Sequence, residues 1–307
     1  MAFILVFLGL AIMLLGIRVM SNGLSQATGP RMRALLGQLT RTRMVGFLSG
    51  TLAAAAAQSS SLVTVLLVGL VDAGLLDYGQ AFGVMLGANV GTTFTLQLLA
   101  LSRDSYALPL IGAGLILVVC SRRGYFYYLG CILLGSGSVF LGFNLISLAC
   151  AGLEQEPAIR HWLAEKAHDP YYGLMLGCAV TGIVQSSSAV MGMVAAMARE
   201  GLLSLHLAVS ICLGANVGTC VTALLTSLGT GVAGRRAAAA HLLFNILGVT
   251  ALFPLLPWFV PMMAATSPDP ALQTANAHTI FNVVTALLAL PFTSWFVTLV
   301  TKLVPDK

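Results

Sequence analysis

The stretch "AAAAAQSSSLVTVLL", residues 53–67, places four consecutive polar side chains inside an apolar run. They are Gln58, Ser59, Ser60 and Ser61, and no charged residue lies next to them. Polar groups that are buried in an apolar surrounding cost free energy unless they find partners. The same four residue types return in the same order as Gln185, Ser186, Ser187 and Ser188. A polar group that recurs in an apolar setting predicts a specific role for both copies.

The composition is that of a membrane protein. Of the 307 residues, 58% are hydrophobic and 8% are charged, whereas about 25% of residues are charged in an average soluble domain. Apolar stretches close to the ~20 residues needed to cross a bilayer recur along the chain. We therefore expect an all-α polytopic protein in a lipid bilayer, and we interpret the N-terminal apolar segment as a membrane helix. The net charge of +5 then reflects membrane topology, and no nucleic-acid partner is expected.

A second polar motif shows that the chain repeats itself. "GANVGT" occurs at Gly87–Thr92 and again at Gly214–Thr219. The step in residue number from the first copy to the second is the same as the step from Gln58 to Gln185. Two unrelated motifs that share one displacement indicate an internal duplication, which is a common construction of transporters.

The duplication predicts a matching order of helices in the two halves. We expect a first repeat over residues 1–123, a second over 124–262, and an extra C-terminal transmembrane helix within 263–307. The expected segments are Gly-rich helices at 2–20 and 125–148, QSSS segments at 45–71 and 172–198, GANVGT helices at 80–101 and 205–228, apolar helices at 107–120 and 237–260, and the extra helix at 277–301.

Each QSSS segment is expected to be a re-entrant helical hairpin. A helix from Gly46 to Gln58 would rise only about 20 Å, which is short of the ~30 Å hydrocarbon core, although each whole segment is long enough for a single span. The loop around Arg31–Arg43 carries four arginines and no acid, whereas the equivalent loop before the second copy is rich in acidic residues. Opposite loop character favours inverted repeats, which need the odd number of spans that hairpins supply. The Arg31–Arg43 loop is then cytoplasmic, in a bacterial inner (plasma) membrane.

The broken helices suggest an anion site. A helix that restarts at QSSS presents free N–H groups and the positive end of its dipole, and serine hydroxyls add donors and caps. Carbonyl, hydroxyl and amide oxygens offer hard ligands for a small alkali cation. Inverted halves would bring two such tips together near the middle of the membrane. The GANVGT helices are expected to be broken as well.

Charged residues are not expected deep inside the spans. Asp72, Asp77, Arg199 and Glu200 fall at segment ends. An anion would therefore be neutralised by dipoles, hydroxyls and a bound cation, and not by a buried arginine. The missing carboxylate relay favours sodium over protons as the coupling ion.

Simpler interpretations compete with these. Serines in membrane helices also bond back to carbonyls or to a neighbouring helix, and the glycines of GANVGT have the GxxxG spacing of close helix packing. Packing leaves the asparagines and threonines of this motif unexplained. "AHLLFN" at 240–245 and "AHTIFN" at 277–282 place His241 with Asn245, and His278 with Asn282, one turn apart. They either join packed helices or line a pathway that relays protons.

Taken together, these motifs resemble the type II sodium/phosphate cotransporter family. That family is marked by paired QSSS motifs in inverted repeats, GAN-(V/I)-GT motifs after them, and an H-x-x-F-N helix after the second. The resemblance covers residues 2–300. It implies sodium-driven transport of inorganic phosphate, with phosphate and sodium held by the QSSS serines. Many bacterial members carry a C-terminal PhoU-like domain, and up to Lys307 this chain shows none, so we expect the bare membrane module.

From the residues and the resemblance together we expect the following ligands. No organic cofactor is expected, and the sequence leaves association into a homo-oligomer open. For phosphate the candidates are Ser59, Ser60, Ser61, Ser186, Ser187, Ser188, Asn89, Asn216, Thr92 and Thr219; for sodium they are Gln58, Ser60, Gln185, Ser187, Thr93, Asn89 and Asn216.

Four other functions remain as alternatives. The same machinery could carry another oxyanion, could export phosphate, or could act as a passive anion channel. An intramembrane serine hydrolase would pair Ser60 or Ser187 with His241, but the sequence lacks a G-x-S-x-G elbow.

Overall fold

The structure is a computed structural model that describes residues 2–38, 42–101, 106–121, 123–153, 156–167 and 169–305. Throughout these residues the regular elements are helices, and none is a strand. Six helical segments within them are long and apolar enough to cross a membrane. The expected all-α polytopic class is confirmed. The candidate spans are Ala2–Leu24, Tyr78–Ala100, Tyr125–Leu153, Leu205–Ser227, Val232–Ala264 and Pro270–Leu303.

The first QSSS segment folds back on itself. Helix α2 (Arg43–Ala57) and α3 (Ser60–Asp72) are too short to be counted among the spans and meet at Gln58. α2 runs parallel to α4 (Tyr78–Ala100), because a methyl group built at Gly83 would lie 2.7 Å from the Arg43 carbonyl oxygen, and Gly91 meets the far end of α2. α3 leads into the start of α4 through a short turn, so α2 and α3 are antiparallel arms.

The second QSSS segment repeats this arrangement. α8 (Pro170–Val184) and α9 (Ser187–Arg199) meet at Gln185, and α8 runs parallel to α10 (Leu205–Gly218). The difference in residue number between Gln58 and Gln185 also separates each end of α2 and α3 from the matching end of α8 and α9, with no residue of deviation. The displacement that was read from two polar motifs therefore also holds for the helix ends.

The two GANVGT helices differ from each other. The expected break is wrong for the first copy, because α4 is continuous through Gly87–Thr92. Glycine packing is common to both copies, because Gly87 and Gly91 lie directly against the α2 backbone and Gly214 and Gly218 lie as closely against the α8 backbone. In the second copy, Thr219 separates α10 from α11 (Cys220–Ser227) while keeping helical dihedral angles.

The C-terminal part contains a shorter repeat. α12 (Val232–Leu252) continues through the 3₁₀ turn η2 (Phe253–Leu255) into α13 (Leu256–Ala264), and α14 (Pro270–Ala289) continues through η3 (Leu290–Phe292) into α15 (Thr293–Leu303). The single helix that was expected over 277–301 is thus interrupted at Pro291, because proline removes a backbone donor. Pro254 interrupts the preceding unit in the same way.

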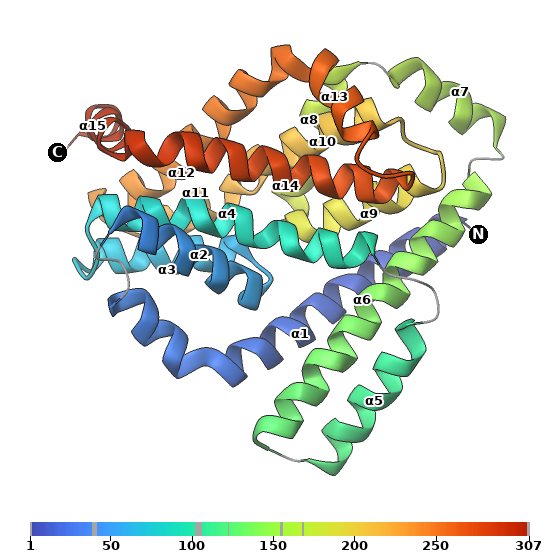
Figure 1. Cartoon of the computed structure of the whole chain (residues 1–307), viewed down its shortest axis with the longest axis horizontal. Coiled ribbons are helices and arrows are strands. Elements are labelled where there is room, and N and C mark those ends of the chain that lie inside the picture. Colours follow the sequence, from blue (N-terminus) through green and yellow to red (C-terminus); the bar gives the residue numbers. More distant parts are fainter. Residues whose placement is uncertain are drawn as a thin grey trace.

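α14 lies in the middle of the molecule (Figure 1) and gives the relative directions of the two halves. Gln97, near the end of α4, donates hydrogen bonds to Asn276 (3.1 Å) and Thr279 (2.9 Å) near the start of α14, so these two helices are antiparallel. In contrast, Figure 1 shows α10 leading into α11 toward the side where α14 leads into α15, so α10 runs with α14. α4 and α10 therefore run in opposite directions.

α1 (Ala2–Gln38) lies along α6 (Tyr125–Leu153) in close contact. A methyl group at Gly16 would lie 2.8 Å from the Gly135 carbonyl oxygen. The sequence predicted that this helix ends near residue 20 and that a loop covers Arg31–Arg43. Both predictions are wrong for residues 21–38, because these residues continue the helix. Residues 39–41 lie outside the described residues. The apolar pattern stops after Met20, but Arg, Leu, Met and Gln remain good helix formers.

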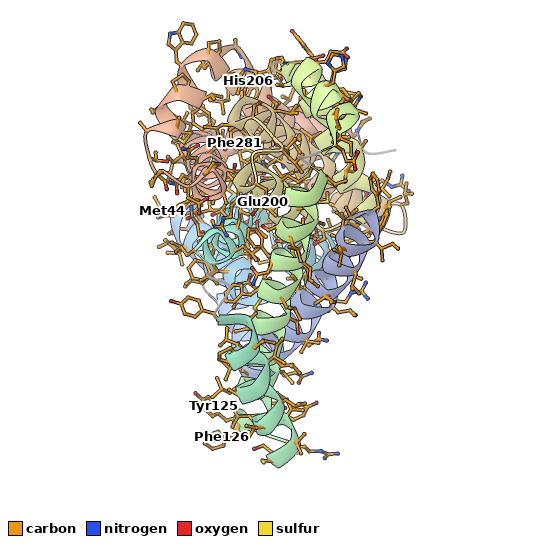
Figure 2. All side chains as sticks on the ribbon, turned by 90° about the vertical axis from the view of Figure 1, so that its right-hand side faces the viewer. Met44, Tyr125, Phe126, Glu200, His206 and Phe281 are labelled. Carbon is orange, nitrogen blue, oxygen red and sulfur yellow. The ribbon has the colours of Figure 1, made fainter. Side chains whose placement is uncertain are left out.

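Two further elements lie at the periphery. α5 (Ala107–Cys120) packs on α6, and Figure 2 shows both extending away from the rest, with Tyr125 and Phe126 at the far end. Most of the apolar side chains of α5 are exposed, as suits a lipid-facing helix. α7 (Pro157–Lys166) forms inside the polar segment that joins the halves.

Candidate functional site

Both QSSS groups lie where one helix ends and the next begins. α2 is capped by Gln58 and α8 by Gln185, with φ angles of 52° and 56°. Among the described residues these are the only non-glycine positions with positive φ, a conformation that costs on the order of 1 kcal/mol or more. Ser59 and Ser186 then cap the next helices, because their hydroxyls accept backbone N–H groups three residues on, at 3.1 and 3.3 Å. The predicted helix break is present at both positions.

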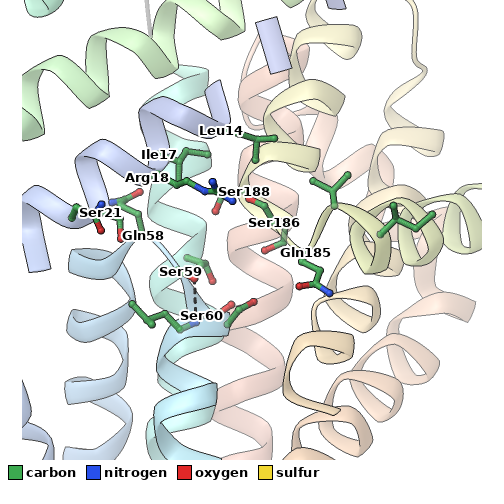
Figure 3. A pocket seen from close by; sticks show the side chains of 17 residues that line it. Leu14, Ile17, Arg18, Ser21, Gln58, Ser59, Ser60, Gln185, Ser186 and Ser188 are labelled. Carbon is green, nitrogen blue, oxygen red and sulfur yellow. Dashed lines mark hydrogen bonds between the residues drawn. The ribbon is translucent and has the colours of Figure 1, made fainter. Parts of the chain in front are cut away.

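The two breaks face one cavity. We call Gln58–Ser61 the first tip and Gln185–Ser188 the second tip. All eight side chains line a cavity of about 390 Å³, and Figure 3 shows the two tips approaching it from opposite sides. Segments from the two halves of the duplication are thereby brought to a single polar site. The remaining lining residues are Leu14, Ile17, Arg18, Ser21, Asn22, Leu62, Thr92, Ile183 and Val184.

The serines of the two tips are available to a solute. Within the part of the chain that the structure describes, no hydrogen bond is made by the hydroxyls of Ser60, Ser61, Ser187 or Ser188. Ser60 and Ser188 are buried, with 3% and 7% of their surface exposed. Bonding back to a helix carbonyl, the simpler interpretation of these serines, therefore does not account for them.

A charged residue also lines the cavity. The expectation that no arginine lies deep in a span is wrong for Arg18, which is in the candidate span Ala2–Leu24. Because α1 continues to Gln38, Arg18 is not near a helix end. Figure 3 shows its side chain extending from α1 toward Ser188. The sequence signal was present, since a lone arginine in an apolar span is by default a functional candidate.

The GANVGT residues occupy different positions. Thr92 lines the cavity, whereas Asn89, Thr93, Asn216 and Thr219 do not. Thr93 and Thr219 donate to carbonyls of their own helices, at 2.7 and 2.8 Å. The Asn216 amide donates to the Cys212 carbonyl at 2.9 Å. These three side chains therefore bond back to carbonyls of their own helices.

Asn89 joins α4 to α12. Its amide donates to the Asn245 side-chain oxygen at 3.1 Å, and its own oxygen lies 3.2 Å from His241 Nε2. His241 has no exposed surface and does not line the cavity. The helix-joining interpretation of the AHLLFN motif is thus confirmed for this copy, and the Ser–His pair of a hydrolase is not formed. In the second copy, Asn282 donates to the His278 carbonyl at 2.8 Å.

The two tips differ in what surrounds the glutamine. Gln58 is buried, donates to the Ala55 carbonyl at 2.7 Å and accepts a hydrogen bond from Thr95. Its counterpart Gln185 is exposed and makes no side-chain hydrogen bond among the described residues. Thr222, which corresponds to Thr95 in the duplication, has a buried hydroxyl without a partner in the described part of the chain. In the sequence, the displacement from Gln58 to Gln185 also takes Thr95 to Thr222, which marks the two threonines as equivalent positions.

The carbonyl groups at the two helix ends also differ. At the end of α2, the Ala54 and Ala55 carbonyls accept hydrogen bonds from the backbone and the side chain of Gln58. The Ala57 carbonyl accepts one from the Ser21 hydroxyl of α1 at 2.7 Å. At the end of α8, no side chain among the described residues donates to the carbonyls of residues 182–184. Neutral oxygens at the second tip therefore remain free for a cation. The described residues contain no cluster of three His, Cys, Asp or Glu side chains that would suit a transition metal.

A model of the Na+/Pi-cotransporter family matches residues 12–148 and 153–257. The uncharacterized protein YqeW of Bacillus subtilis is 32% identical over 263 residues, which cover 86% of this chain and 85% of that protein. The putative inorganic phosphate export protein YjbB of Escherichia coli is 27% identical over 256 residues, 83% of this chain but 46% of that protein.

A shorter match reaches an animal protein. The sodium-dependent phosphate transport protein 2A of Oryctolagus cuniculus is 40% identical over 93 residues, which are 28% of this chain and 14% of that protein. No solved structure matches the chain. Because the family model covers well over half of the sequence, the chain belongs to the Na+/Pi-cotransporter family.

Proposed function

We propose that this protein is a secondary active transporter that couples sodium movement to the transport of inorganic phosphate by alternating access. One observation carries the proposal: the QSSS tips of both halves line a single polar cavity. Membership of the Na+/Pi-cotransporter family supports phosphate as the substrate and sodium as the coupling ion.

Phosphate is proposed to bind between the tips. The N-termini of α3 and α9 direct their first N–H groups and the positive ends of their dipoles toward the cavity side of each tip. Four serine hydroxyls that have no partner among the described residues add donors. A tetrahedral anion has four oxygens to accept hydrogen bonds from donors on both sides, so it can join the two halves through itself. The proposed phosphate ligands are the serines of the two tips. Thr92 lines the same cavity, but its hydroxyl donates to the Ala88 and Asn89 carbonyls.

Sodium is proposed to bind beside the phosphate with neutral oxygen ligands. Of the expected sodium ligands, Gln58, Ser60, Gln185 and Ser187 line the cavity. Outside it, Asn89 bonds to α12, and Thr93 and Asn216 bond back to their own helices. The second tip is the better candidate, because its amide, its helix-end carbonyls and the Thr222 hydroxyl have no protein partners among the described residues. Hard cations prefer such oxygens.

The membrane arrangement is proposed to be a pair of inverted repeats, residues 1–123 and 124–262, followed by 263–307. The opposite directions of α4 and α10 and the fold-back of α2–α3 and α8–α9 support inversion with two re-entrant hairpins. Helices of 13 to 15 residues rise only about 20–22 Å, less than the ~30 Å hydrocarbon core. The proposed location is the bacterial inner membrane, with Arg31–Arg43 on the cytoplasmic side.

Transport assays test this function. Purified protein in proteoliposomes should accumulate radiolabelled phosphate when an inward sodium gradient is imposed, and should not do so with a potassium gradient of equal size. Equal accumulation in both gradients would remove the sodium coupling. If sulfate or arsenate inhibited the uptake of labelled phosphate as strongly as unlabelled phosphate does, the substrate would be assigned to another oxyanion. Phosphate flux that follows the anion gradient alone would indicate a channel.

Export is a second candidate direction. It is favoured by the relative from Escherichia coli, whose name describes phosphate export and of which this chain spans just under half. If export is the working direction, cells that overproduce this protein should release preloaded labelled phosphate while the normal inward sodium gradient is maintained. Retention of label together with sodium-dependent uptake would establish import.

A further inference from the structure

A polar face of α1 connects the tip cavity with a second cavity. Arg18, Asn22 and Gln26 are spaced by four residues and therefore lie on one side of the helix. Arg18 and Asn22 line the tip cavity, while Asn22 and Gln26 line the second one. Asn22 is thus shared, and the two cavities adjoin along this face.

The second cavity is polar, like the first. It encloses about 680 Å³ between α1 and the start of α6 and also contains Arg123, Tyr127, Tyr128 and Cys131. A channel for apolar molecules would not need an arginine at each end and amides between them. The lining therefore suits a hydrated anion.

Both arginines lack a counter-charge among the described residues. Two other arginines among the described residues do have partners: Arg199 pairs with Asp269 at 2.7 Å, and Arg43 donates to Ser294 at 2.6 Å. For Arg18 and Arg123, the described residues provide neither an ion pair nor a side-chain hydrogen bond. Arg18 lies inside a candidate span, where an uncompensated guanidinium is costly unless it faces a polar cavity. A bound anion would supply the missing partner.

We propose that the anion moves along this polar face of α1. Arg18, at the tip cavity, is the inner anion-binding residue, and Arg123, at the second cavity, is the outer one. The inner part rests on the proposed function, since Arg18 then holds one side of the phosphate that the two tips hold on the other. The outer residue attracts anions into the second cavity, from which Asn22 and Gln26 lead to the tips. Guanidinium groups suit this role because they match the oxygen geometry of phosphate.

The inner residue is tested by binding. Arg18→Gln should weaken the binding of inorganic phosphate by about tenfold or more, because a charge-assisted contact is lost, and Arg18→Lys should recover part of the loss. The matched control is Arg235→Gln, an exposed arginine on α12 that lines neither cavity. The sodium-induced shift in melting temperature should persist in Arg18→Gln, which separates lost charge from lost fold. Unchanged phosphate affinity in Arg18→Gln would overturn the inner assignment.

The outer residue is tested with Cys131, a natural reporter in the second cavity. Cys120 and Cys178 are replaced by alanine, while the buried Cys150, Cys212 and Cys220 are kept. An anionic methanethiosulfonate reagent should then modify Cys131 faster than a cationic one, after correction for their rates with a free thiol. Arg123→Gln should abolish this preference, and inorganic phosphate should slow the anionic reagent in the protein that retains Arg123.

The outcomes separate the two claims. A reagent preference that is unchanged in Arg123→Gln, or that does not fall as ionic strength rises, overturns the outer residue. Wild-type protein that binds no phosphate at all would end the proposed function, but the reagent preference at Cys131 would still report whether the cavity attracts anions.

Discussion

The two tips have the same four residues and the same backbone path but different surroundings. The first tip is held from two sides: Thr95 bonds Gln58, and Ser21 of α1 bonds the Ala57 carbonyl. The second tip has no such supports among the described residues, since Gln185 is exposed and the Thr222 hydroxyl is buried without a partner. Motif identity thus fixes the local helix break, while neighbouring helices decide whether its polar groups are already occupied. We infer that the first tip is a fixed wall of the site and the second tip is the side that responds to ligands.

The largest expected effects come from the tip serines that have no partner among the described residues. Ser60→Ala and Ser187→Ala should each weaken phosphate binding by about ten- to a hundredfold, because each removes a hydrogen bond to a charged ligand. Isothermal titration with phosphate at fixed sodium measures this. Ser138→Ala is the control, since that serine donates to the Leu134 carbonyl within α6 and lines neither cavity. Normal affinity in either tip variant would remove that tip from the site.

Glycines under the two hairpins should respond differently. A methyl group at Gly173 would lie 2.6 Å from Ser210 Cβ, whereas one at Gly46, the equivalent position, would be 3.4 Å from the nearest atom, the Gln80 carbonyl oxygen. Gly173→Ala should therefore lower the free energy of unfolding by about 1–3 kcal/mol through overpacking. Gly46→Ala should be nearly neutral, helped by the better helix propensity of alanine. Thermal unfolding in detergent compares them, and equal destabilisation would show that the hairpins are packed alike.

The two threonines sharpen the comparison of the tips. Thr95→Val leaves the buried Gln58 oxygen without its donor and should cost about 1–3 kcal/mol of stability. Thr222→Val removes a buried hydroxyl that has no partner in the described part of the chain and should not lower stability without sodium. It should, however, reduce the sodium-induced increase in melting temperature. A Thr222→Val protein with a full sodium response would exclude this hydroxyl from the cation site.

The smallest effect is expected at the contact of α1 with the first tip. Ser21→Ala deletes the donor to the Ala57 carbonyl, and a typical hydrogen bond contributes about 0.5–1.5 kcal/mol. The melting temperature should fall slightly, and phosphate affinity should fall less than in the tip variants. A loss as large as that of Ser60→Ala would mean that Ser21 contacts the anion directly.

Much of the fold was predictable because its signals are local. The two QSSS breaks combine a residue that ends one helix with a serine that caps the next, and the displacement shared by the two motifs carried the prediction from one half to the other. The bounds of α8 and α9 follow from those of α2 and α3 in this way.

The parts that failed depend on packing between distant helices. A lone arginine in an apolar span marked Arg18 as a candidate, but its place beside the tips depends on how α1 crosses the rest of the molecule. Asn89 was expected to be a ligand, but its amide faces α12, where Asn245 and His241 engage it. An amide in a helix is equally suited to either role, and only the neighbouring helix decides.

The central claim is that one anion touches both tips, and phosphate protection tests it most directly. Ser61→Cys and Ser186→Cys are prepared singly in a Cys120→Ala, Cys131→Ala, Cys178→Ala background, and their rates of thiol modification are measured over a range of phosphate concentrations at fixed sodium. A shared site predicts that phosphate protects both cysteines with the same half-protecting concentration. Protection of only one cysteine, or two clearly different concentrations, would contradict the account.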